Sequence, residues 1–414
     1  MSRTLTTPEV AEAIEGLGTV DLVVGLPTVG PTPAAAQLVQ AARGALDEQL
    51  AGHAALFVHV DPTPSEETAA QVAAAVGPHG LVQVETSGLP STRVPGEAPE
   101  EDEAVRAILE VARRAGARAV LVLDPVLSAP VAADMVALVK PVLKDDRALV
   151  LPCFDRGRNE GTLTHALVVP MVRALFGQRI AYPLAREFAC SGATATALLG
   201  QDVWGTELAR HGLEFLIPVA AIAGGSAVSQ ALVGPRTAPV GRPAPLGPTV
   251  GRVATSLFAL AERYEATWLD VVGSVPVATA GRPPEILEGG GTADPERMLA
   301  GFRLGVRDLL SIWERILAPD NLAVILELSD AGADEFHLPD ALWARVVYDF
   351  LLGFRFRVVY RTHLVQSLAP LYLARAASVV LETRGRPAAA IAQAGDRLGQ
   401  GFEREKIYLT ERWQ

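Results

Sequence analysis

The chain has 414 residues, of which 50% are hydrophobic and 20% are charged, and its formal net charge is −11. This length suffices for a large core, and the negative charge argues against nucleic acid or an anionic membrane surface as the main partner. The two cysteines, Cys153 and Cys190, have no disulfide or metal-binding pattern, which favours a reducing compartment. We expect a cytoplasmic protein without a transmembrane segment, because no signal peptide is evident and no uncharged apolar stretch approaches the roughly 18 residues of a membrane span.

The first half of the chain alternates short apolar runs with Ala-rich stretches of helical spacing. The predicted strands cover residues 20–28, 55–60, 81–85, 119–123, 149–152 and 227–233, and residues 180–190 are expected to form a strand and a turn. The predicted helices between them cover residues 33–50, 104–115, 162–176 and a stretch that opens at residue 65, and residues 205–216 are helical or irregular. This alternation is typical of an α/β fold with a mostly parallel sheet and helices on its faces.

The second half of the chain is predicted to be helical. A Pro- and Gly-rich linker at residues 239–249 marks a shift in composition. The helices predicted beyond it cover residues 250–271, 295–317, 340–360 and 362–382. We therefore predict an α/β domain at residues 1–238 and a helical C-terminal domain at residues 250–414.

Two aspartates, Asp61 and Asp124, each follow a predicted strand. Parallel strands bring such residues to the edge where open α/β sheets bind ligands. Alternate residues of a strand face the same side, so a second Asp two positions after Asp124 would complete a clamp for a metal, but Val126 stands there. One carboxylate with substrate phosphates and water still suffices for Mg²⁺, which leaves Asp124 as a candidate ligand for Mg²⁺ or Mn²⁺. The alternative role for both aspartates is in turns or helix caps.

A loop at residues 155–161 carries Arg156 and Arg158 just before a predicted helix. Guanidinium groups beside helix amides suit a carboxylate or a phosphate. The alternatives are local ion pairs in a solvated loop and, for Thr164, a helix cap.

Two acidic residues, Glu187 and Glu214, lie among apolar neighbours. A carboxyl in such surroundings is a candidate for a donor-site or general-base role. The alternative is an ion pair with Arg186 or with another basic group.

Several segments, in this order, resemble the glucosylglycerate and mannosylglycerate synthase group. They are residues 21–28, the strand that ends at Asp124, and residues 173–177, 183–188, 212–214 and 363–382. Members of this group are retaining glycosyltransferases of the GT-A fold, which move glucose or mannose from a nucleotide-diphospho-sugar to glycerate or 3-phosphoglycerate. The resemblance implies a GT-A α/β domain with a helical extension and a hexosyltransferase activity.

The resemblance also implies roles for individual residues. The positions expected at the donor nucleotide are Pro27, Thr28, Asp61 and Asp124. Asp124 matches the first Asp of the metal motif of the group. Arg156 and Thr164, with Arg158 beside them, match the residues that bind the carboxylate of the acceptor. Glu187 and Glu214 match acids at the donor sugar, and we expect the catalytic groups there.

The sequence departs from the motifs of the group at the metal and at the donor diphosphate. Val126 replaces the second metal ligand, no histidine occurs near Ala238, and Ala185–Arg186 replaces a Gly-Gly pair. The acidic stretch 95–103 replaces a Gly-Lys-Gly loop. Together these changes remove electrostatic stabilisation that sugar transfer from a diphosphate needs.

Two hypotheses follow. One is an active glycosyltransferase with altered or no metal dependence, which takes a sugar nucleotide and a small carboxylate acceptor. The other is a catalytically impaired relative that binds a ligand or serves as a partner of a sister subunit. A sugar-nucleotide pyrophosphorylase is disfavoured, because the sequence has no Gly-rich N-terminal loop with Lys or Arg. The apolar helical faces suggest a homodimer, and a monomer with a helical core explains them equally well.

Overall fold

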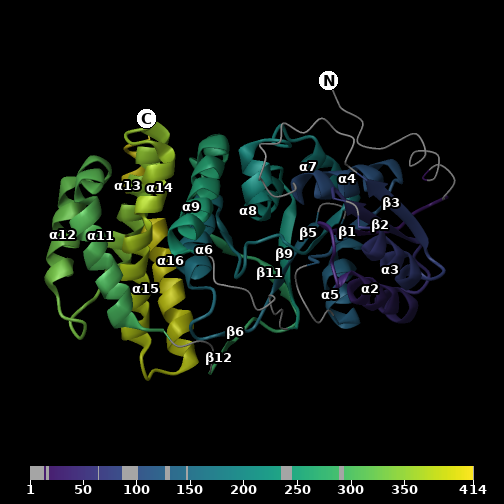
Figure 1. Ribbon diagram of the computed structural model, residues 1–414, viewed down its shortest axis with the longest axis horizontal. Helices are drawn as coiled ribbons and strands as arrows, with labels where there is room; N and C mark the ends of the chain where they lie inside the picture. Colours follow the sequence, from purple (N-terminus) through teal and green to yellow (C-terminus); the bar gives the residue numbers. More distant parts are fainter. Residues whose placement is uncertain are drawn as a thin grey trace. The chain divides into compact units, whose positions relative to one another are not determined.

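The computed structural model describes residues 14, 18–63, 65–85, 101–125, 131–145, 148–234, 245–288 and 293–413. The chain forms two compact units, each built from segments that are not continuous in the sequence (Figure 1). The first unit comprises residues 1–154, 184–241 and 277–283. The second unit comprises residues 155–183, 242–276 and 284–414.

The first unit is built around a sheet with the strand order β11-β9-β5-β8-β4-β1-β2-β3. Its strands are β1 (Leu22–Pro27), β2 (Ala55–Asp61), β3 (Gly80–Glu85), β4 (Ala119–Val122), β5 (Ala148–Cys153), β8 (Phe188–Ser191), β9 (Ala227–Leu232) and β11 (Ala278–Ala280). Strand β8 is antiparallel to both of its neighbours, and the other pairs are parallel. The predicted α/β fold with a mostly parallel sheet is therefore confirmed.

Helices cover the sheet of the first unit. They are α2 (Ala35–Gln49), α3 (Glu66–Val76), α4 (Glu101–Arg114), α5 (Ala132–Val142), α7 (Gly192–Leu199) and α8 (Glu207–Ala223). Helix α8 covers most of residues 205–216, which we expected to be helical or irregular, and it continues to Ala223 with a kink at Gly212, where φ is −140°. Helix α3 begins as expected at Ser65, whose hydroxyl accepts a hydrogen bond from the N–H of Thr68 at 3.3 Å.

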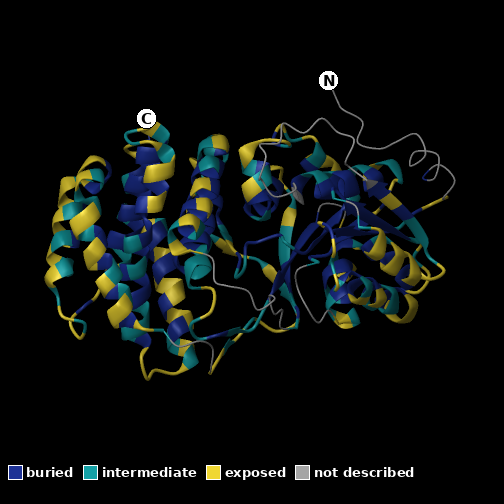
Figure 2. Ribbon diagram, in the orientation of Figure 1, coloured by how far each residue is buried: buried dark blue, intermediate teal, exposed yellow. Residues whose placement is uncertain are grey.

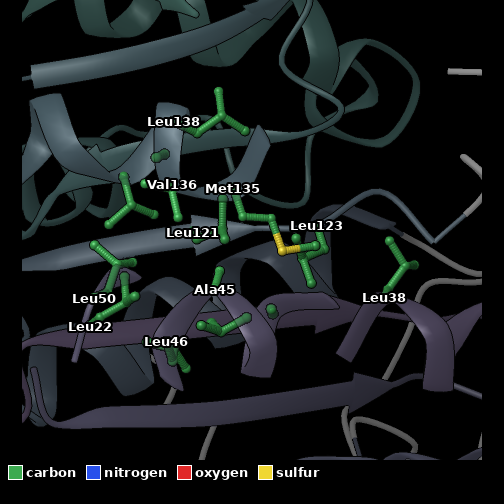
Figure 3. Close-up of a cluster of buried hydrophobic side chains, with 14 of the residues drawn as sticks. Leu22, Leu38, Ala45, Leu46, Leu50, Leu121, Leu123, Met135, Val136 and Leu138 are labelled. Atoms are coloured by element: carbon green, nitrogen blue, oxygen red, sulfur yellow. The ribbon is translucent and has the colours of Figure 1, made fainter. Parts of the chain in front are cut away.

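The core on one face of this sheet packs β1 and β4 against α2 and α5 (Figure 3). Leu22 and Leu121 come from the strands, and Leu46 and Leu138 come from the two helices; all four are at most 2% exposed. Burial of one such side chain contributes about 1.5–3 kcal/mol. Figure 2 shows the central strands of the sheet as buried, whereas β9 and β11 at one edge are partly exposed. The sheet is therefore a rigid base for the residues that follow its strands.

The second unit is mainly helical. Its helices are η1 (Thr164–Val168, one turn of π-helix), α6 (Val169–Phe176), α9 (Leu246–Arg263), α10 (Glu265–Trp268), α11 (Pro295–Ile316), α12 (Pro319–Asp330), α13 (Asp340–Phe356), α14 (Arg361–Ser367), α15 (Ala369–Thr383) and α16 (Ala388–Thr410). The second unit also contains two short pairs of parallel strands. Strand β6 (Arg156–Gly157) pairs with β12 (Ile286–Leu287), and β7 (Gln178–Arg179) pairs with β10 (Val275–Pro276). The helical content predicted for the second half is confirmed, and α12 and α16 were not predicted.

One segment of the described residues, Arg361–Thr383, is long and apolar enough to cross a membrane by length and composition. It forms α14 and α15, and 67% of its most apolar window is buried inside the protein. Arg375 in this segment is also buried and forms an ion pair with Asp340 at 2.7 Å. The burial matches that of a core helix pair.

Candidate functional site

Three neighbouring parallel strands of the first unit end at one edge of its sheet. Strand β1 lies between β4 and β2, with Gly25 paired to Val122 and Pro27 paired to Val60. The residues that follow or end these strands, Thr28, Asp61 and Asp124, are all buried. The structure thus brings Pro27, Thr28, Asp61 and Asp124 to the carboxyl edge of the sheet, where open α/β folds bind ligands.

Asp61 is 4% exposed and uses its two carboxylate oxygens differently. Oδ1 accepts hydrogen bonds from the N–H groups of Gly30 and Thr63, at 3.1 and 2.9 Å, and so joins the loops after β1 and β2. Oδ2 is buried and has no hydrogen-bond partner among the described residues. The turn role holds for Oδ1, and Oδ2 is a buried acceptor whose hydrogen bond is not made by any described residue.

Two more buried polar side chains, those of Thr28 and His59, lie at this edge of the sheet. Thr28 Oγ1 and His59 Nε2 are hydrogen-bonded at 2.8 Å. Burial lowers the pKa of His59, and the charge of Asp61 opposes that shift. The imidazole is therefore neutral near pH 7.

Asp124 is held by Arg186. Arg186 Nε donates to Asp124 Oδ2 at 2.7 Å, and Arg186 Nη1 lies 3.4 Å from Glu214 Oε2. The side chain of Asp124 is 1% exposed, whereas those of Arg186 and Glu214 are 36% and 15% exposed. The predicted pairing of Glu214 with Arg186 is thus present, and the same guanidinium also neutralises the strand-end aspartate.

The sequence places Arg186 there through strand β8. Because β8 is antiparallel to β4, with Phe188 opposite Val122, the residues before β8 lie where β4 ends. The N–H of Ala185 donates to the carbonyl of Glu214 at 2.8 Å, which fixes this segment to α8. We call Thr28, His59, Asp61, Asp124, Arg186 and Glu214 the strand-end cluster.

The described residues do not fit a divalent cation at Asp124. The carboxylate is bonded to a guanidinium, whose rigid fork of donors matches carboxylate geometry. Within the part of the chain that the structure describes, no three His, Cys, Asp or Glu side chains gather as metal ligands would. Val126 and Ala238, the positions at which the metal ligands were expected, lie outside the described residues.

The remaining predicted acids of the first unit lie in different surroundings. Glu187, next to Arg186, is 2% exposed. Of the acidic stretch 95–103, residues 95–100 lie outside the described residues. The prediction of a loop is wrong for the other three residues, because they begin helix α4. Among them, the carboxylate of the buried Asp102 accepts a hydrogen bond from the N–H of Gly205 at 3.4 Å.

The second unit holds the arginine loop. Arg156 lies in β6 and donates to the carbonyl of Glu160 at 3.0 Å, and no described carboxylate lies within ion-pair distance of it. Burial lowers the pKa of Arg156, and the charge of Glu160 opposes that shift. Burial and the positive charge of the nearby Arg156 lower the pKa of His165 to about 3. Sequence reasoning missed His165; its only signal was its place next to Thr164.

Arg158 and Thr164 differ from Arg156. Arg158 donates to Glu288 Oε2 at 2.8 Å and to the carbonyls of Thr383 and Arg386, so its guanidinium joins the segment before α16 to the loop. Its surroundings match the alternative of local ion pairs. Thr164 is the first residue of η1, and its hydroxyl has no hydrogen-bond partner among the described residues.

Comparisons with protein-family models and with curated proteins find no match. Among solved structures, the chain is similar to glucosyl-3-phosphoglycerate synthase from Mycobacterium tuberculosis in complex with phosphoglyceric acid, with 22% identity and a TM-score of 0.44 over 64% of this chain and 86% of that one. The complex of the same enzyme with Mn²⁺, UDP-glucose and phosphoglyceric acid matches with the same values. Its complex with Mg²⁺ and UDP matches with 20% identity and a TM-score of 0.44, over 64% of this chain and 85% of that one.

Proposed function

We propose that the protein is a glycosyltransferase-like enzyme that binds a nucleotide-diphospho-sugar at the strand-end cluster and transfers its hexose to a small carboxylate acceptor. The observation that carries this proposal is the buried Asp61 Oδ2, an acceptor without a partner among the described residues at the carboxyl edge of a mostly parallel sheet. Glucose or mannose as the hexose, and glycerate or 3-phosphoglycerate as the acceptor, follow from the resemblance in motif order.

The chemistry of Asp61 selects the kind of ligand. A carboxylate oxygen that is buried without a donor costs about 1–3 kcal/mol, and a ligand N–H or O–H recovers that free energy. A nucleobase supplies such an N–H, and a ribose supplies such an O–H. The neighbouring Thr28–His59 pair adds polar groups at the same edge, with the imidazole neutral. A nucleoside therefore fits this edge better than an inorganic anion does.

The second unit supplies a candidate site for the acceptor. Arg156 is partly buried and bonds to backbone carbonyls without a described carboxylate partner, so its charge is available to an anion. A guanidinium binds a carboxylate or a phosphate through paired hydrogen bonds. His165 and the hydroxyl of Thr164 lie on the same short helical segment, where they add polar groups to the site. The pKa of His165 is about 3, so its imidazole is uncharged near pH 7. This combination supports glycerate or 3-phosphoglycerate as the acceptor class.

Transfer requires that one bond to the hexose breaks and another forms. The bond from sugar C1 to the β-phosphate oxygen breaks, and its electron pair leaves with the nucleoside diphosphate. A bond forms between C1 and the acceptor hydroxyl oxygen, and the hydroxyl proton passes to a carboxylate. Glu187 and Glu214 are the candidates for the groups at the donor sugar, since both adjoin Arg186 in sequence or in space.

A second candidate function is a catalytically impaired relative that only binds a ligand or a partner subunit. One observation favours it: two carboxylates, those of Asp124 and Glu214, already contact the guanidinium of Arg186. Carboxylates beside a guanidinium weaken its attraction for a diphosphate. The two functions differ in whether transfer follows binding.

The experiment that tests the proposal is a transfer assay with UDP- and GDP-linked glucose and mannose, each with glycerate and with 3-phosphoglycerate, in Mn²⁺ and in EDTA. Product formation that is lost in Asp61→Asn and kept in Asp21→Asn supports the proposal of an active glycosyltransferase. Asp21 is a matched control, because it accepts the N–H of Ala54 at the opposite edge of the sheet. Saturable binding without product supports the impaired relative, and no binding in any condition overturns both.

A further inference from the structure

We infer that Arg186 is a resident cation that takes the place of a divalent metal at Asp124, so that the phosphates of a nucleoside diphosphate bind at the strand-end cluster without a metal ion. This inference rests on the proposed function for its ligand. Its claim about the metal stands on the geometry of Arg186 alone.

The first step is the burial of Asp124. Its side chain is 1% exposed, and a charged carboxylate removed from water is costly unless a partner compensates its charge. Arg186 provides that partner through its Nε at 2.7 Å, the length of a charge-assisted hydrogen bond. A metal ion at Asp124 would have to displace this guanidinium or lie beside it against the repulsion of like charges.

The second step is the fixed position of Arg186. The register between β8 and β4 sets its backbone beside the end of β4, and the N–H of Ala185 bonds to the Glu214 carbonyl. The guanidinium then contacts a strand-end carboxylate on one side and Glu214 of α8 on the other. Arg186 is therefore built into the cluster from two elements, unlike a surface arginine with a single partner.

The third step is the accessibility of the Arg186 guanidinium to a ligand. The side chain of Arg186 is 36% exposed, while Asp124 is buried beneath it. An anionic ligand thus reaches the guanidinium before it reaches the carboxylate. A planar guanidinium binds phosphate oxygens as well as carboxylate oxygens, so it can serve both at once. A nucleoside diphosphate bound through Asp61 supplies such oxygens.

The metal claim is tested without any nucleotide. Titration of Mn²⁺ into the protein, followed by electron paramagnetic resonance, is expected to show at least tenfold weaker Mn²⁺ binding for the wild type than for Arg186→Met, in which Asp124 loses the guanidinium that competes with a metal. Arg186→Lys keeps the positive charge and is expected to resemble the wild type. Arg118→Met is the matched control, because Arg118 pairs with Asp21 at 3.5 Å at the other edge of the sheet. Equal Mn²⁺ affinity in the wild type and in Arg186→Met overturns the claim, provided that circular dichroism shows both proteins to be folded.

The ligand claim is tested with UDP and GDP by calorimetry. The wild type is expected to bind with dissociation constants in EDTA and in Mn²⁺ that agree within about twofold, and Arg186→Met is expected to bind at least tenfold more weakly in EDTA. Wild-type binding that is lost in EDTA overturns the inference and leaves the proposed function standing. Absence of binding in both conditions overturns the proposed function, and the Mn²⁺ titration then still decides whether Arg186 excludes the metal.

Discussion

Arg186 Nε lies 2.7 Å from Asp124 Oδ2 at the carboxyl edge of the sheet. The aspartate comes from the end of a parallel strand, and the arginine comes from the segment before the antiparallel strand β8. The protein thus neutralises its buried strand-end carboxylate with a residue of its own. We therefore expect this pairing to contribute to the stability of the edge.

The loss of the Arg186 guanidinium should destabilise the first unit. In Arg186→Met the buried Asp124 loses a charged hydrogen-bond donor, and we expect the free energy of unfolding in urea to fall by about 1–3 kcal/mol. Arg307→Met is the control, since Arg307 pairs with Asp308 on the exposed surface and such pairs contribute less than about 1 kcal/mol. An equal effect of both substitutions would show that the Arg186 pair has no special weight.

The loss of the unpartnered carboxylate of Asp61 should weaken nucleotide binding. Asp61→Asn keeps an acceptor for the N–H groups of Gly30 and Thr63 but replaces one buried acceptor with a donor. We expect the affinity for UDP or GDP to fall at least tenfold, about 1.4 kcal/mol, by calorimetry. Asp21→Asn should leave this affinity unchanged, and equal affinity in both variants would contradict the role of Asp61.

His165 should make the protein less stable in acid. Its pKa is about 3 in the folded protein and about 6.5 in the unfolded chain, so the unfolded state binds the extra proton between these values. Stability therefore rises with pH through this window, by up to about 1.4 kcal/mol per pH unit for one proton, and levels off above it. Urea unfolding between pH 4 and pH 7 should show a smaller slope for His165→Gln. An unchanged slope would show that the imidazole is protonated in the folded protein.

Arg156 should bind the acceptor anion. Arg156→Met removes a charged donor, and we expect at least tenfold weaker binding of 3-phosphoglycerate by calorimetry, about 1.4 kcal/mol. Arg303→Met is the matched control, because Arg303 of the same unit also bonds to backbone carbonyls, those of Ser329 and Ala331. If the two substitutions weaken binding equally, the effect is one of net charge and the site is elsewhere.

The predictable part of the fold is the part with strong hydrophobic periodicity. Buried parallel strands such as Leu22–Pro27 are continuous apolar runs between helices, which the sequence displays directly. Helix α16 was missed because its packing uses glycines, which weaken a helical pattern. At Gly399 an added Cβ would lie 2.6 Å from Arg173 Nη1, so a larger residue there would displace the Arg173 side chain. No pattern in the sequence reveals such a contact.

The candidate site was predictable to the same degree. Alternating strands and helices place Asp61 and Asp124 at one edge, and the structure has them there. The contact between Arg186 and Asp124 depends on the antiparallel direction of β8, which the sequence does not indicate. A composition shift likewise cannot show that residues 155–183 pack with the C-terminal helices, since that depends on contacts such as Trp343 Nε1 to the Ala166 carbonyl at 2.7 Å.

Hydrogen–deuterium exchange with UDP-glucose or GDP-mannose in EDTA tests most directly whether the strand-end cluster is the nucleotide site. Asp61 holds the N–H groups of Gly30 and Thr63, so a ligand at Asp61 should slow exchange in peptides that cover these two residues. Peptides at the opposite edge, around Asp21 and Ala54, should exchange as in the free protein. The account predicts slower exchange at Gly30 and Thr63 without a metal, and unchanged exchange there under saturating ligand would contradict it.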